Sequence, residues 1–127
     1  MELNIHDQTI NASTQPLYDL SSIKAISRGN DLFVEKMVNM FIDLVPAMVT
    51  EMEQHFLQNN LKAMSEVAHK IKPVVDNLGI LIIKDPIRQI EKIGSLEISE
   101  TSIPQLLSLI KLTIDQVAAL LKIEFSV

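Results

Sequence analysis

The feature that most constrains this chain is the spacing of apolar residues between positions 61 and 78. Six of them recur at alternating steps of three and four: Leu61, Met64, Ala68, Ile71, Val75 and Leu78. An α-helix turns by about 100° per residue, so this spacing places all six side chains on one face. The segment is therefore predicted to be an amphipathic helix that packs against other helices and ends at Gly79.

One reactive side chain, His69, lies on the polar side of this predicted helix, about 160° from the centre of the apolar face. Lys72 follows one turn later on the same flank. A neutral imidazole offers a nitrogen lone pair that attacks phosphorus without a separate base. A lysine one turn away would offset the negative charge of the phosphoryl group. We therefore interpret His69 as a phosphate acceptor and Lys72 as the residue that stabilises the phosphate.

A long helix is predicted before this segment, from a cap at Asn30 or Asp31 to about Phe56. Pro46 falls inside it, so a kink is expected there. The residues expected on its buried face are Val34, Met37, Phe41, Leu44, Met48 and Met52.

Two further helices are predicted after Gly79. Asp85 would cap the first and Pro86 would occupy its first position, with Gly94 at its end and Ile87, Ile90 and Ile93 buried. The second would begin after Ser102. Its expected buried face is Ile103, Leu107, Ile110, Ile114, Val117 and Leu121.

The N-terminal part of the chain divides into two pieces. Residues 1–16 are polar and aperiodic, which predicts a flexible arm. A short helix from about Ser21 to Arg28 should follow and stop at Gly29. Residues 17–127 would then form one all-α domain, an up-and-down four-helix bundle with an additional short N-terminal helix.

Composition excludes several classes of function. The net charge of −5 and the low aromatic content of 4% argue against nucleic-acid binding. No apolar stretch is long enough to cross a membrane and no signal pattern opens the chain, so we expect a cytoplasmic protein.

Positions 62–92 carry six basic and four acidic residues. An anionic partner would dock there, although chance clustering on a solvated face accounts for this excess equally well.

The sequence gives little support to other chemical functions, such as metal binding or enzymatic catalysis. Glu66 and His69 have the Glu-x-x-His spacing of di-iron bundles, but those sites need a second copy and two further inward glutamates. The three histidines lack metal-ligand spacing, and no phosphate-binding loop or Ser or Cys nucleophile motif is present. We therefore expect no metal site, no cofactor and no ATP-dependent enzyme.

The segment Ala68-His69-Lys70-Ile71-Lys72, followed by Leu78-Gly79, resembles the histidine phosphotransfer (HPt) domain signature. In that family the histidine is followed by any residue, an aliphatic residue, Lys, Gly and Ser, with a hydrophobic residue and Gly about one helix further. Pro73 and Val74 stand where the family usually has Gly and Ser. The resemblance extends in register over roughly residues 17 to 122.

This resemblance implies a phosphocarrier that relays a phosphoryl group between receiver-domain aspartates through phospho-His69. The receiver would supply Mg²⁺ and most of the catalysis, and the partners would be response-regulator receiver domains and a hybrid sensor histidine kinase. By alignment with the family, Glu91 would hydrogen-bond the imidazole. Residues expected to contribute to receiver docking are Lys70, Gly79, Ile23 and Ile26. We expect a monomer. The alternative is a helical adaptor that binds receivers without being phosphorylated.

Overall fold

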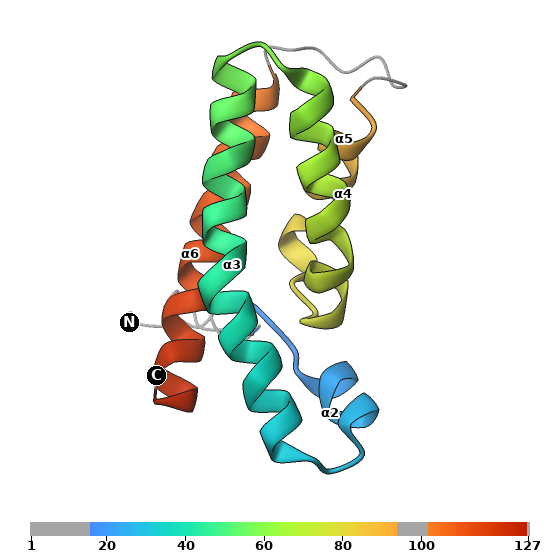
Figure 1. Cartoon of the computed structure of the whole chain (residues 1–127), viewed down its shortest axis with the longest axis vertical. Coiled ribbons are helices and arrows are strands. Elements are labelled where there is room, and N and C mark those ends of the chain that lie inside the picture. The colour runs from blue at the N-terminus through green and yellow to red at the C-terminus, as the bar shows by residue number, and fades with distance from the viewer. Residues whose placement is uncertain (1–15, 94–101, 127) are drawn as a thin grey trace, which may run out of the picture.

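The computed structural model describes residues 16–93 and 102–126, which contain helices and no strand (Figure 1). The predicted arm before Pro16 and the predicted helix end at Gly94 lie outside these residues. The described elements, in chain order, are α2 (Ser21–Ser27), α3 (Asp31–Leu57), α4 (Leu61–Asn77), the 3₁₀ turn η1 (Leu81–Ile83), α5 (Lys84–Glu91) and α6 (Ile103–Phe125).

The four main helices form an antiparallel bundle. In Figure 1, α3 and α5 run in one direction and α4 and α6 run in the other. Helix α3 packs against both α4 and α6, and α5 packs against the same two helices from the other side. The short α2 packs against α3. The predicted fold class, an up-and-down four-helix bundle with an additional N-terminal helix, is confirmed.

Asparagine side chains fix the starts of α3 and α4. The Asn30 side chain accepts a hydrogen bond from the backbone N–H of Phe33, and Asn60 does the same for Ala63, each at 3.1 Å. Such caps satisfy backbone donors that the first helical turn leaves without partners. Helix α3 continues through Pro46, and α4 continues through Pro73.

Apart from the half-buried Leu61, the predicted apolar faces of α4 and α6 are buried, but the predicted buried face of α3 is partly wrong. Val34, Phe41 and Met52 are in the core, whereas Leu44 is 52% exposed. Met37 and Met48 are half-buried. The remaining core positions of α3 belong to Val38, Val45 and Val49. The buried face is therefore rotated toward these valines, which lie between α4 and α6.

The predicted start of α5 was also wrong. The helix begins at Lys84, directly after η1, and no side chain caps it, so Asp85 is not the cap. Ile87 and Ile90 are buried, and Ile93 is half-buried. The 3₁₀ turn buries Ile83 and brings the chain from the end of α4 into α5.

The segment before α2 is attached to the end of α4. The Asp19 backbone N–H donates a 2.8 Å hydrogen bond to the Leu78 carbonyl. Gly79 follows with φ +61°, and a Cβ at that position would lie 2.8 Å from the Cβ of Asp19. Both the left-handed conformation and the close approach therefore require glycine at position 79. Within the described residues, no helix combines the length and the apolarity needed to cross a membrane.

Candidate functional site

His69 projects from the solvent side of α4. Its side chain is 69% exposed, while its neighbours Ala68 and Ile71 are fully buried. The helix is thus fixed by its apolar face, and the ring is presented to solvent by a rigid element. A group in this position is open to a macromolecular partner.

Glu91, the last residue of α5, reaches the imidazole from the neighbouring helix. Its Oε2 lies 2.5 Å from Nδ1 of His69. The Ser65 hydroxyl, one turn before His69 on α4, donates to the backbone carbonyl of Glu91. Both the side chain and the backbone of Glu91 are therefore held against α4.

Lys72 binds the same carboxylate. Its Nζ lies 2.9 Å from Oε1 and 3.0 Å from Oε2 of Glu91. The hydrogen bond from Lys72, followed by that from His69, lowers the pKa of Glu91 below its ordinary value. The carboxylate is therefore ionised near neutral pH and can only accept hydrogen bonds.

This ionisation state determines the tautomer of His69. Because Glu91 accepts, Nδ1 must carry the hydrogen, and the lone pair of a neutral ring then lies on Nε2. The arrangement provides a nucleophilic nitrogen on an exposed ring. It also keeps an ammonium group one turn away, at Lys72.

The surroundings of the ring are polar and shallow. A depression of about 400 Å³ beside His69 is lined by Ser65, Glu66, His69, Lys70 and Glu91. Two turns along α4 from His69, Asp76 Oδ2 accepts a 2.7 Å hydrogen bond from the Arg88 guanidinium. The bond to Arg88 lowers the pKa of Asp76. This second link between α4 and α5 holds the two helices together below the site.

The predicted docking residues divide into exposed and buried ones. Lys70 is exposed, and Ile26 is 61% exposed. Ile23 is only 3% exposed, because the short α2 is held to the bundle through it, and its expected docking role stays a prediction. Gly79 is half-buried against Asp19, and its conformation there is a requirement of the fold.

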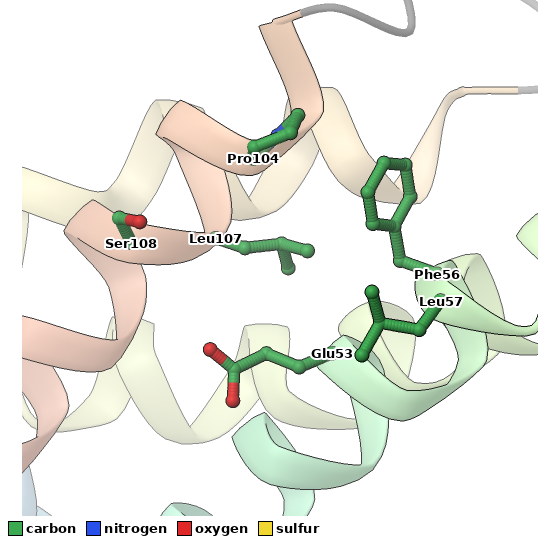
Figure 2. Close-up of a pocket in the computed structure, with 6 residues that line it drawn as sticks. All are labelled: Glu53, Phe56, Leu57, Pro104, Leu107 and Ser108. Carbon is green, nitrogen blue, oxygen red and sulfur yellow. The ribbon is translucent and has the colours of Figure 1, made fainter.

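A separate apolar pocket lies between α3 and α6, away from His69. It has a volume of about 420 Å³ and is lined by Glu53, Phe56, Leu57, Pro104, Leu107 and Ser108 (Figure 2). None of the predicted site residues lines it. Among the described residues, no group of three or more His, Asp and Glu side chains could hold a metal ion.

Sequence reasoning missed two contacts that shape the site. It assigned Lys72 to the phosphate and did not pair it with Glu91, and it gave Ser65 no role. The signal was present in the spacing. Ser65, His69, Lys72 and Asp76 follow one stripe of α4, and Arg88 and Glu91, three positions apart, share one side of α5. Two facing stripes of this kind indicate pairing between helices.

The sequence matches a protein-family model over most of the bundle. A model described as Hpt domain matches residues 36–120, which is more than half of the chain. No match was found among curated proteins or among solved structures. The matched region includes α4 with His69 and Lys72, and α5 with Glu91. The chain therefore belongs to the Hpt domain family, whose members carry phosphoryl groups on histidine in two-component signalling.

Proposed function

We propose that this protein relays a phosphoryl group from the phosphoaspartate of one receiver domain to an aspartate of another, with His69 as the intermediate carrier. The observation that carries the proposal is the contact of Glu91 with both His69 and Lys72 beside an exposed ring. This contact leaves Nε2 of His69 available as the nucleophile.

In the first step, Nε2 of His69 attacks the phosphorus of an aspartyl phosphate. A nitrogen–phosphorus bond forms, the acyl phosphate P–O bond breaks, and the receiver aspartate leaves as a carboxylate. The Nδ1 proton stays between His69 and Glu91, so no base has to remove it. In the second step the aspartate of another receiver attacks the phosphorus, and the imidazole leaves.

Lys72 would assist by changing its partner. In the structure its ammonium is bound to Glu91, one turn along α4 from His69. A phosphoryl group on Nε2 brings a more highly charged acceptor within reach of this side chain, and charge-assisted hydrogen bonds to phosphate are strong. Movement of Lys72 toward the phosphoryl group would stabilise phospho-His69. Glu91 would remain paired with the imidazole.

The partner supplies what this site lacks. We expect Mg²⁺ to be held by the receiver, where it would neutralise the phosphoryl oxygens during transfer. We also expect a hybrid sensor histidine kinase to be the source of the phosphoryl group. This chain would provide the nucleophile, the cation and a docking face that includes Lys70 and Ile26.

The test is transfer from a phosphorylated receiver domain with labelled phosphate, followed by phosphoamino-acid analysis. Wild-type protein should acquire acid-labile label, and His69→Gln should acquire none. His55→Gln is the matched control, because His55 is 23% exposed on α3 and no lysine lies one turn before or after it in the sequence. Since an outward side chain contributes little packing, His69→Gln should unfold at the wild-type urea concentration.

Label that survives His69→Gln would refute the carrier role. A receiver that binds wild-type protein without transferring label would favour the alternative function, a non-phosphorylated adaptor. Titrating the receiver with the wild-type protein alongside the transfer assay measures binding separately, so the two functions are distinguished.

A further inference from the structure

Helix α6 is apolar on its outward side as well as on its core side. The outward stripe contains Leu112, which is 57% exposed, and Ile123, which is 76% exposed. Leu109 and Leu120 are 38% and 43% exposed, and Gln116 and Ala119 lie between them at exposed positions. Scattered surface leucines are ordinary, but a continuous stripe along one helix is not.

The stripe follows the heptad spacing of helices that pair with other helices. Leu109, Leu112, Gln116, Ala119 and Ile123 are separated by steps of three, four, three and four. Beside them a depression of about 340 Å³ is lined by Leu17, Gln116, Ala119 and Leu120. Leu17 thus widens the apolar surface at the level of Ala119.

We propose that this stripe is the interface with a second copy of the chain, with the two α6 helices packed antiparallel about a twofold axis. Leu112 of one copy would face Ile123 of the other, and Gln116 would face Ala119. Each contact occurs twice by symmetry, as in other isologous interfaces.

Charge complementarity selects this partner and this register. Asp115 and Lys122 lie on one flank of the stripe, seven residues apart. In the proposed register, Asp115 of each copy lies opposite Lys122 of the other, so two attractive pairs form across the interface. A shift by one heptad would place the two Asp115 side chains opposite each other, which is unfavourable. A parallel arrangement would lose both pairs.

The existing partner of Asp115 does not prevent this pairing. Lys111 Nζ lies 3.6 Å from Asp115 Oδ2 within α6, and both side chains are about half exposed. A long, exposed pair within one helix holds its members weakly. Asp115 would lie between Lys111 of its own helix and Lys122 of the second copy.

The size of the interface makes the dimer weak. About sixteen residues of each α6 would overlap, a length of roughly 24 Å at 1.5 Å per residue. One helix pair of this length is at the small end of specific interfaces, so self-association is expected at roughly 10 to 100 µM. Helix α6 lies diagonal to α4 in the bundle, so both copies of His69 would stay open to receivers.

Sedimentation equilibrium on the full chain over about 10 µM to 1 mM tests this proposal, because the range brackets weak interfaces of this size. Wild-type protein should shift from monomer to dimer. Asp115→Lys alone and Lys122→Asp alone should each weaken self-association by about tenfold, since each places like charges opposite one another. An equimolar mixture of the two variants should form dimers again, because every pair across the interface is then attractive.

Three controls keep the result specific. Leu112→Glu should abolish the dimer, and Leu57→Glu, at an 81% exposed position at the end of α3, should not. Lys36→Asp makes the same charge change as Lys122→Asp on an exposed face of α3 and should leave self-association unchanged. Far-UV circular dichroism of each variant checks that the bundle is folded.

A wild-type chain that stays monomeric at the highest concentration would overturn the proposal. A dimer that survives Leu112→Glu would place the interface elsewhere, and a mixture of the charge variants that fails to associate would exclude the antiparallel register. None of these readouts depends on phosphotransfer, so this proposal and the proposed function can fail separately.

Discussion

The carboxylate of Glu91 lies 2.5 Å from Nδ1 of His69, although the two residues belong to different helices and are 22 positions apart. The end of α5 therefore controls the orientation and the tautomer of a ring on α4. Lys72 binds both oxygens of the same carboxylate, so the charges of the site are coupled before any phosphate arrives.

The first prediction concerns stability and pH. Because hydrogen bonds from Lys72 and His69 lower the pKa of Glu91 in the folded state, Glu91 stabilises the fold above its unfolded pKa. This contribution is lost as the pH falls through the lowered folded pKa. Glu91→Gln should therefore be less stable than wild type at neutral pH, and the difference should shrink below about pH 4. Urea unfolding followed by circular dichroism at several pH values measures it.

Glu66→Gln is the control for this experiment, because Glu66 is exposed on the same helix as His69. Its unfolding midpoint should stay close to wild type at every pH. A Glu91→Gln variant whose deficit is the same at acid and neutral pH would show that the carboxylate's charge contributes nothing.

The second prediction separates the two lysines near the ring. Lys72 is 29% exposed and bound to Glu91, whereas Lys70 is exposed on the other flank of α4. Lys72→Ala should slow phosphoryl transfer by roughly ten- to a hundredfold, the kinetic equivalent of losing one charged hydrogen bond. Lys70→Ala should have a smaller effect. Transfer rates of the two variants are measured by rapid quench with a phosphorylated receiver. Equal reductions in rate would mean that the overall positive charge, and not the position of the ammonium group, determines the rate.

The third prediction compares two glycines that both have positive φ. Gly79→Ala should destabilise the bundle by about 2–4 kcal/mol, because it adds a close contact with Asp19 to the strain of a left-handed alanine. Gly29→Ala has open space around the new methyl group and should cost only about 1 kcal/mol. Chemical unfolding of the two variants gives both values. Similar losses at the two positions would argue that conformational strain alone explains them.

The fourth prediction concerns Pro73, which departs from the family pattern. In an α-helix the amide of residue 73 would bond to the carbonyl of His69, and proline has no such amide. Pro73→Ala restores the donor at an exposed position of α4 and should stabilise the protein by up to about 3 kcal/mol. Thermal and urea unfolding test this, with Pro46→Ala as the comparison in α3. A loss of stability would show that the surrounding structure already compensates for the proline.

The sequence predicted α4 and α6 well because their core positions form a single clear stripe. In α3, by contrast, apolar residues occupy both sides of the stripe, for example Leu44 beside Val45 and Met48 beside Val49. Periodicity alone cannot choose between such neighbours. The choice is made by the positions of α4 and α6, which are tertiary information.

The candidate site was likewise predictable from the sequence only in part. His69 was identified as exposed from one helix alone, since the phase of α4 fixes it. The pairing of Lys72 with Glu91 depends on how α5 approaches α4, and that approach is set by η1. This turn holds Leu81 and Ile82 in solvent and only Ile83 in the core, a pattern that no periodicity predicts. Ile23 is buried because a seven-residue helix needs its main apolar side chain as an anchor.

The bond from the Asp19 amide to the Leu78 carbonyl has a consequence for how the protein opens. An amide before the first helix of the described region would ordinarily exchange its hydrogen with solvent as quickly as any terminal segment. Here the Asp19 amide is hydrogen-bonded to the end of α4, and the backbone of Gly79 lies in close contact with Asp19. Its exchange should follow the opening of the whole bundle, so the cooperative unit that unfolds together includes the residues just before α2.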